Sequence, residues 1–343
     1  MSEFSGFEID SIDQLLSESA PGSQYRRLRV ANTPSGAPIS VPVHFIQGSM
    51  DGPRLVLLSG VHGDEGLGPL ALGRFLGEID STSLRGSVIA VPVCNPPAFE
   101  NRSRVNAWDG GDLIRLWPGR ADGSITERVA AAIFAAVTPG ANALIDLHSG
   151  TSVLHEYWVL YANRHGPRAA VNADVEKRSL ELARAFGVTQ IIRRHPWFGT
   201  HMAAGNAGIP SLVTEIGGGA DYLQNGDKYL GVIVRGIKNA LRHLDMLPGE
   251  PESDGPAGVF DIAEEFVAAA DTGGYWIRAV EPGQRVTAGT TIGHFADPST
   301  GREIKRLVSS VDGVILNPIA AWPHVGHGQW LLAIGSPVDE RSL

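Results

Sequence analysis

Short, mainly apolar runs recur along the N-terminal part of the chain, and each leads into a polar or glycine-rich turn. They cover residues 55–58, 88–93, 143–147 and 209–213. Apolar runs of about four to eight residues are typical of strands that are buried on both faces of a parallel or mixed sheet. The pattern therefore predicts a buried sheet that contains these four strands.

Between these runs, apolar residues recur at helical spacing. The segments that predict amphipathic helices are residues 68–76, 126–136, 175–186 and 229–244. The first of them should return the chain across the sheet between the first two buried strands. The alternation of strands and helices predicts an α/β fold.

The segments before the first buried strand have a different pattern. Residues 27–30 and 39–45 have strand composition and flank a Thr-Pro-Ser-Gly turn, which predicts a hairpin. Residues 12–16 predict a short amphipathic helix within a peripheral segment of residues 1–25.

The composition changes after residue 247. Residues 248–257 are rich in proline, glycine and acidic residues, which is typical of a linker. Beyond them, short strands separated by glycine-containing turns predict a small all-β, barrel-like domain over residues 258–343. The expected organisation is an α/β domain of residues 1–247 followed by this β-rich domain.

Composition and charge narrow the class of partner. The chain has 343 residues, a net charge of −9 and no run of five or more basic residues. This disfavours a nucleic acid or a membrane surface as the partner and favours a small molecule. A homo-oligomer is compatible with the sequence, which does not define the oligomeric state.

Cys94 is the only cysteine, so no intrachain disulfide can form. It lies in an apolar run, where a packed core thiol is the expected role. The first residues do not resemble a secretory signal, and no run of eighteen apolar residues occurs. We therefore expect a cytoplasmic protein.

The first buried strand ends in a glycine-flanked turn that carries His62 and Glu65, three residues apart. Ligands of open α/β sheets sit beyond the carboxyl ends of the strands, so both side chains should project into a crevice. Two histidines and one glutamate form a catalytic zinc set with an open fourth position. A His-x-x-Glu sequence alone is more often a surface pair or a helix start, so this interpretation depends on the other strand ends.

Two further strands carry polar residues where the apolar runs end. His148 ends the third run and could be a hydrogen-bonded core histidine or a ligand, with Asp146 as a possible orienting partner. Glu215 ends the fourth run, just before three glycines. Because burial of an unpaired carboxylate costs several kcal/mol, Glu215 needs a metal, a role as a base, or an arginine in a structural ion pair.

The loop of residues 95–119 is rich in arginine, asparagine, aspartate, glycine and proline. Long ordered loops in compact domains are often functional, although each of its arginines could also be solvated surface charge.

Together these motifs resemble the succinylglutamate desuccinylase/aspartoacylase family of zinc hydrolases, which are relatives of the zinc carboxypeptidases. The residues that carry the resemblance are His62-Gly63-Asp64-Glu65, Arg104, Asp112-Leu113-Ile114-Arg115, Asp146-Leu147-His148 and Glu215-Ile216-Gly217-Gly218. The resemblance covers about residues 27–340. It implies a zinc-carboxypeptidase-like mixed sheet flanked by helices, followed by the small β-rich domain.

The resemblance also implies roles for individual residues. One Zn²⁺ per chain would be held by His62, Glu65 and His148, and Glu215 would act as general base and acid. Arg104 falls where the family places the arginine that polarises the scissile carbonyl. Arg115 falls where it places the arginine that holds the substrate carboxylate.

The chain departs from the family pattern at Ile114, where the family has an asparagine that helps to bind the substrate carboxylate. We expect a substrate whose carboxylate is held less tightly, or whose amine half is more apolar, than aspartate or glutamate derivatives. Alternatively, a neighbour such as Asn106 supplies the missing donor and the specificity is unchanged.

The function that follows is zinc-dependent hydrolysis of the amide bond of an N-acyl amino acid. One alternative is a zinc carboxypeptidase that acts on peptide C-termini. Another is a zinc-dependent binding protein without turnover, which Glu215 disfavours because a binding protein needs no buried base. The sequence identifies neither the acyl group nor the amine half.

Overall fold

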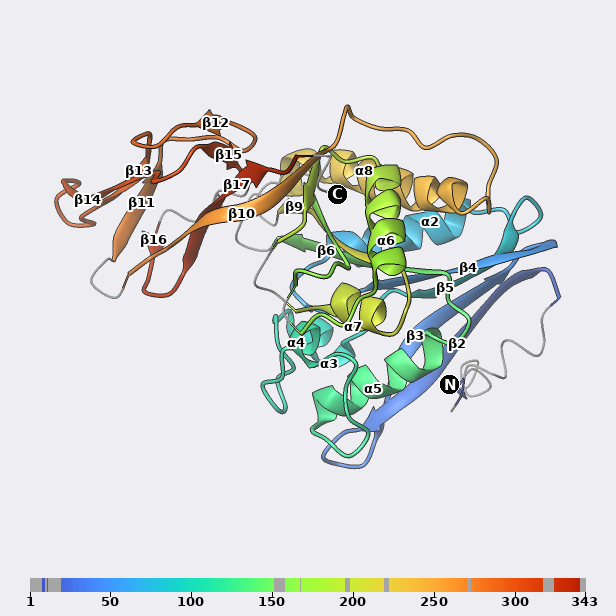
Figure 1. Ribbon diagram of the computed structural model, residues 1–343. Helices are drawn as coiled ribbons and strands as arrows, with labels where there is room; N and C mark the ends of the chain where they lie inside the picture. The colour runs from blue at the N-terminus through green and yellow to red at the C-terminus, as the bar shows by residue number, and fades with distance from the viewer. Residues whose placement is uncertain are drawn as a thin grey trace.

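The computed structural model describes residues 8–9, 11, 20–150, 158–166, 168–194, 198–218, 222–269, 273–316 and 324–339. Within these residues the chain forms one large mixed sheet flanked by helices and a separate four-stranded antiparallel sheet (Figure 1). The predicted α/β fold with a C-terminal β-rich part is therefore confirmed.

Thirteen described strands form the large sheet. In spatial order they are β1 (Glu8–Ile9), β2 (Gly22–Asn32), β3 (Pro38–Gln47), β5 (Arg85–Val91), β4 (Met50–Ser59), β6 (Ala143–Gly150), β9 (Ser211–Gly218), β7 (Trp158–Tyr161), β8 (Gln190–Ile192), β10 (Gly258–Val267), β17 (Trp330–Pro337), β15 (Gly313–Ile315) and β12 (Arg285–Val286). Strands β5, β4, β6 and β9 are neighbours and run parallel. They contain the four predicted buried strands, and β2 and β3 form the predicted hairpin.

Helices cover both faces of the central strands, which explains why consecutive residues in the middle of these strands are apolar (Figure 1). One face packs against α2 (Leu67–Glu78), α6 (Ala173–Phe186) and α8 (Tyr222–His243). The other packs against α5 (Ile125–Val137), α7 (Thr200–Asn206) and the short helices α3 (Pro96–Asn101) and α4 (Leu113–Leu116). Within β4, Leu55 and Leu57 face the first group, whereas Val56 and Leu58 face the second.

The helix predictions differ from the structure mainly at helix ends. Helix α8 begins at Tyr222, earlier than residue 229, where the predicted helix starts. The loop predicted over residues 95–119 contains α3 and α4, which are too short to show a helical period. The helix predicted over residues 12–16 lies outside the described residues.

Cys94 is fully buried, which agrees with a packed core thiol. Burial, and after it the nearby charge of Asp146, raises the pKa of the thiol well above its usual value. No helix among the described residues is long and apolar enough to cross a membrane.

The C-terminal part contains the four-stranded sheet and also extends the large one. The smaller sheet has the order β14 (Glu303–Val308), β13 (Thr291–Ala296), β11 (Gly274–Arg278) and β16 (His324–Val325). Strand β10 pairs in parallel with β8 and antiparallel with β17, so the large sheet continues past the predicted boundary at residues 248–257.

The predicted linker segment is bound to α8. The buried side chain of Asn239 accepts a hydrogen bond from the backbone N–H of Glu252 at 2.9 Å and donates one to the carbonyl oxygen of Glu252 at 2.6 Å. This pairing imitates one step of a β-ladder, and it fixes the path of the chain into β10.

An ion pair joins the end of β8 to β10. Nε and Nη2 of Arg193 donate to the two carboxylate oxygens of Asp261 at 2.9 and 2.6 Å. The Arg193 side chain is only 10% exposed and that of Asp261 21%. Burial alone would raise the pKa of Asp261, but the hydrogen bonds and the charge of Arg193 lower it below its usual value.

We predict that Asp261→Asn lowers the free energy of unfolding by about 1–3 kcal/mol at neutral pH, because it leaves a nearly buried guanidinium without its partner charge. Since the pKa of Asp261 is depressed in the folded state, its contribution is present above about pH 4 and is lost as the pH falls through the folded-state pKa. Urea unfolding at several pH values measures this difference. The control is Asp174→Asn, which removes the exposed pair with Arg178 on α6. Equal effects of both substitutions would contradict the prediction.

Candidate metal centre and active site

The metal-binding turn follows β4, and its shape depends on glycine. Gly60 has a φ of 60°, in the left-handed region that favours glycine. At Gly63 an added Cβ would lie 2.0 Å from the carbonyl carbon of Ala98. The turn therefore packs directly against the backbone of α3, and this contact directs His62 and Glu65 inward.

Strand register brings the other site residues next to this turn. Ser59, the last residue of β4, pairs with Leu147 on β6, so His148 lies beside the turn that starts after Ser59. On the far side of β6, His148 pairs with Glu215 on β9. The carboxyl ends of three adjacent parallel strands thus supply the predicted ligands and the predicted base.

The three predicted ligands converge around the carboxylate of Glu65. Nδ1 of His62 lies 2.7 Å from Oε1, and Nδ1 of His148 lies 2.8 Å from Oε2. One donor atom from each residue lies within 4.8 Å of the others, and all three side chains are buried. His62, Glu65 and His148 form a buried metal site.

A second carboxylate lies behind each imidazole. Nε2 of His62 lies 3.1 Å from Oδ1 of Asp112, and Nε2 of His148 lies 3.1 Å from Oδ2 of Asp146. Histidine ligands usually present their other ring nitrogen to such an acceptor, which fixes the tautomer and the ring orientation. The arrangement leaves both Nδ1 atoms for the metal, so the donor set fits a bound cation.

Asp146 has a partner that the sequence did not reveal. Oγ1 of Thr200, the first residue of α7, donates to Oδ2 of Asp146 at 2.5 Å, and both residues are fully buried. Thr200 is far from Asp146 in the sequence, so no local pattern connects them. Asp112 was part of a recognised motif, but its contact with His62 was not predicted.

Charges around the centre shift the pKa values of nearby groups. Burial alone would raise the pKa of Asp112, but hydrogen bonding to His62 and the charge of Arg104 lower it to about 2. Burial, and after it the negative charge of Glu65, raises the pKa of Glu215 to about 7. A cation bound to the nearby ligands would lower the pKa of Glu215 again.

Two arginines of the long loop lie at the rim of the metal centre. Nη1 of Arg104 lies 3.7 Å from Oε1 of Glu65, and its Nε lies 3.5 Å from Oδ2 of Asp112. Nε of Arg115 donates to the same Asp112 oxygen at 3.2 Å. Their side chains are 49% and 70% exposed, so both guanidinium groups can also contact an incoming anionic group. Arg102, the third arginine, follows α3 as its C-cap residue and is exposed.

The two other predicted substrate residues differ in environment. Ile114 is partly buried and packs against the hydrophobic core on the sheet face that α4, α5 and α7 cover. It also lies close to Gly199, where an added Cβ would be 3.2 Å from Cδ1 of Ile114. Asn106 is fully buried, and its Oδ1 accepts from the backbone N–H of Trp108 at 3.0 Å. Asn106 therefore organises the loop through Oδ1, whereas its Nδ2 is buried and has no hydrogen-bond partner among the described residues. Its role as a donor in place of an asparagine at residue 114 stays a prediction.

Comparison with known proteins identifies the family. Residues 51–244 match the model of the succinylglutamate desuccinylase/aspartoacylase catalytic domain. The chain belongs to this family. The expectation from the sequence motifs is confirmed, and the protein is an amidohydrolase that removes acyl groups from N-acyl amino acids.

Relatives in the family agree with this assignment. The N-alpha-acetyl-L-2,4-diaminobutyric acid deacetylase of Halomonas elongata is 31% identical over 282 residues, which cover 80% of this chain and 79% of the relative. A succinylglutamate desuccinylase structure from Silicibacter has a TM-score of 0.79 at 22% identity, over 93% of this chain and 96% of the other. The product-bound ectoine utilization protein of Ruegeria pomeroyi has the same TM-score at 22% identity, over 92% and 96%. These two structures show that the fold is shared.

We predict that His148→Ala abolishes stoichiometric metal binding and activity, because only two of the three ligands remain. Elemental analysis of the purified protein and an N-acyl amino acid hydrolysis assay measure the two effects. His165→Ala is the control, because His165 is partly exposed and lies outside the metal site. Full metal content and normal turnover in His148→Ala would place the metal elsewhere.

Proposed function

We propose that this protein is a zinc-dependent deacetylase of a basic N-acetyl amino acid, with N-α-acetyl-L-2,4-diaminobutyrate as the first candidate substrate. The hydrolytic activity is supported by the buried set of His62, Glu65 and His148, with Glu215 on the strand adjacent to His148. The candidate substrate is supported by the Halomonas elongata relative, which is named for it.

The donor set supports zinc as the metal. Two neutral imidazoles and one carboxylate are a ligand set of catalytic zinc sites, with a fourth position open. When bound there, zinc would polarise the scissile carbonyl and activate a water molecule as the nucleophile.

Glu215 acts as the general base and acid in this proposal. Its carboxylate takes a proton from the attacking water and delivers it to the nitrogen of the departing amine as the carbon–nitrogen bond breaks. The products are a carboxylate and a free amino acid. Its place on β9, directly beside His148 on β6, suits this double role, because one carboxylate can reach both the attacking water and the departing amine.

Arg104 and Arg115 bind two different groups of the substrate, the scissile carbonyl and the carboxylate. Arg104 lies beside Glu65 and stabilises the negative charge that develops on the carbonyl oxygen, an effect commonly worth about 3–4 kcal/mol. Arg115, which Asp112 holds through Nε, keeps its terminal nitrogens for the substrate carboxylate. Asp112 thereby fixes the distance between the metal site and the carboxylate-binding arginine.

Ile114 supports a substrate other than an aspartate or glutamate derivative. An asparagine at this position would donate an N–H to the substrate carboxylate, and losing such a charge-assisted bond removes about 1.5–3 kcal/mol. A diaminobutyrate derivative has one carboxylate and a cationic side chain, whereas aspartate and glutamate derivatives carry a second carboxylate. The relative's name supports the basic substrate class, and Ile114 is compatible with it as a substrate whose carboxylate is held less tightly.

We predict that Glu215→Gln keeps its zinc and loses at least about a hundredfold in kcat, in line with typical general acid and base contributions. The substitution preserves size and removes the proton acceptor. Metal analysis and steady-state kinetics on the same preparation separate loss of zinc from loss of catalysis. Glu264→Gln on β10, where Glu264 binds Ser310, is the control. A near-native rate with bound zinc would leave Glu215 as a structural residue only.

We also predict that kcat/KM for N-α-acetyl-L-2,4-diaminobutyrate exceeds that for N-acetylaspartate and for N-succinylglutamate by at least about tenfold, the ratio expected from one lost charge-assisted hydrogen bond. Ile114→Asn should narrow this ratio by improving the acidic substrates. A substrate panel that includes short peptides measures both effects. Efficient turnover of either acidic substrate by the wild type, at about 10⁴ M⁻¹s⁻¹ or above, would contradict the proposed specificity.

A further inference from the structure

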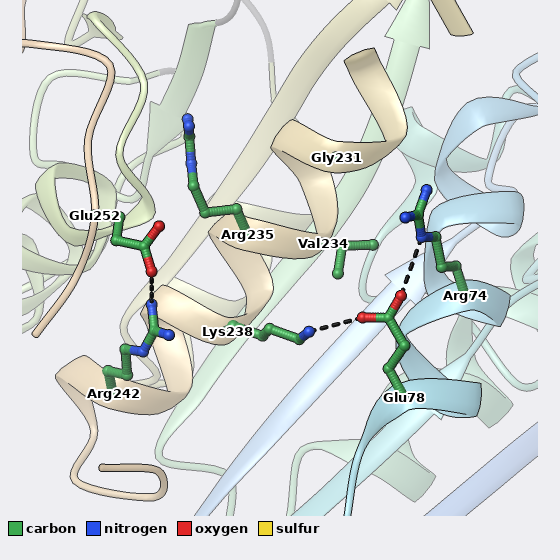
Figure 2. Close-up of a pocket in the computed structure, with 8 residues that line it drawn as sticks. All are labelled: Arg74, Glu78, Gly231, Val234, Arg235, Lys238, Arg242 and Glu252. Atoms are coloured by element: carbon green, nitrogen blue, oxygen red, sulfur yellow. Dashed lines mark hydrogen bonds and ion pairs between the residues drawn. The ribbon is translucent and has the colours of Figure 1, made fainter. Parts of the chain in front are cut away.

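A hollow of about 320 Å³ lies between α2 and α8, among residues that do not belong to the metal centre. Its charged lining consists of Arg74, Glu78, Arg235, Lys238, Arg242 and Glu252 (Figure 2). Hollows of this volume are at the small end of the range that binds small molecules in proteins.

The lining has an excess of positive charge. Four basic side chains face two carboxylates, and a third carboxylate, Asp254, pairs with Arg235 from outside the hollow at 2.6 and 2.7 Å. The excess is one positive charge even when Asp254 is counted. The whole chain has the opposite sign, with a net charge of −9, so this excess is a local feature.

The excess arises because two cations share one carboxylate. Nε of Arg74 donates to Oε1 of Glu78 at 3.0 Å, and Nζ of Lys238 donates to Oε2 at 2.7 Å. Figure 2 shows the two basic side chains reaching Glu78 from different helices. Within the part of the chain that the structure describes, the terminal nitrogens of Arg74 make no hydrogen bond. Glu78 balances only one of the two cations, and donors remain for a further anion.

A glycine keeps the space above these donors open. Gly231 lies in the interior of α8, one turn before Val234 (Figure 2). Glycine in a helix interior costs about 1 kcal/mol relative to alanine. A Cβ added at Gly231 would meet no atom within 4 Å, so packing does not require a glycine there. Its effect is to leave open space against the helix.

We propose that this hollow is a binding site for a small phosphate group, either inorganic phosphate or the phosphate of a monoester. The unbound donors of Arg74 and Lys238 supply charge-assisted hydrogen bonds, which suit phosphate oxygens. The apolar surface of Gly231 and Val234 accommodates the remainder of a monoester. The site is independent of the proposed deacetylase activity, because none of its residues contributes to the metal centre.

The test is calorimetric titration of the zinc-loaded protein at neutral pH with inorganic phosphate and, in a second arm, with glycerol 3-phosphate. Sodium chloride keeps the ionic strength constant, so that general screening does not contribute. Lys238→Gln should weaken binding at least about tenfold, because it removes the excess charge and a donor. Lys177→Gln is the matched control, because Lys177 is an exposed lysine paired with Glu181 on α6, 4.0 Å away. It should bind phosphate like the wild type.

Gly231→Met tests the space rather than the charge. It keeps every charged side chain, improves helix propensity and fills the hollow, so it should weaken binding at least about fivefold without lowering Tm.

The arm that binds more tightly identifies free phosphate or a monoester as the preferred form. The proposal is overturned if the wild type binds neither anion beyond the chloride control. It is also overturned if Lys238→Gln and Gly231→Met bind as tightly as the wild type, which would place the anion elsewhere, for example at the metal centre.

Discussion

The buried carboxylate of Glu65 is the group on which the site depends. It is only 6% exposed, and a carboxylate in such a position costs several kcal/mol unless other groups compensate. Two imidazoles face its oxygens, and the backbone N–H of Ser149 donates to Oε2 at 3.2 Å. Burial alone would raise the pKa of Glu65, but the charges of His62 and His148 lower it well below its usual value. The charge of Glu65 thus orders both histidines before any metal arrives.

Much of the fold and the metal site followed from the sequence, because local patterns determine them. Apolar runs such as residues 55–58 and 143–147 identify central strands, and in parallel strands the carboxyl ends lie at the same edge. His62, Glu65, His148 and Glu215 all follow or end such runs, so their convergence could be predicted. Family motifs added the two arginines and identified the departure at Ile114.

The features that the sequence did not reveal are contacts between distant or very short segments. Thr200 on α7 donates to Asp146 on β6, and nothing in the sequence neighbours of Thr200 marks it as a partner of the site. Helices α3 and α4 have only six and four residues, too few for a hydrophobic period. Residues 248–257 have linker composition, yet the side chain of Asn239 binds the backbone of Glu252 and fixes that segment. The composition of a segment indicates how flexible the segment would be on its own, but it does not indicate which residues elsewhere in the fold will bind the segment.

The pairing of β8 with β10 affects how the two parts of the molecule can evolve. An exposed strand edge is a template for association with other chains, and here β10 covers the edge of β8. The C-terminal part therefore serves as an edge cap for the hydrolase sheet. An exchange of this part between relatives, by recombination or by engineering, would succeed only if the incoming strand matched the register of Gln190–Ile192 and supplied a counterpart for Arg193. In evolution, the two parts are expected to have been inherited together.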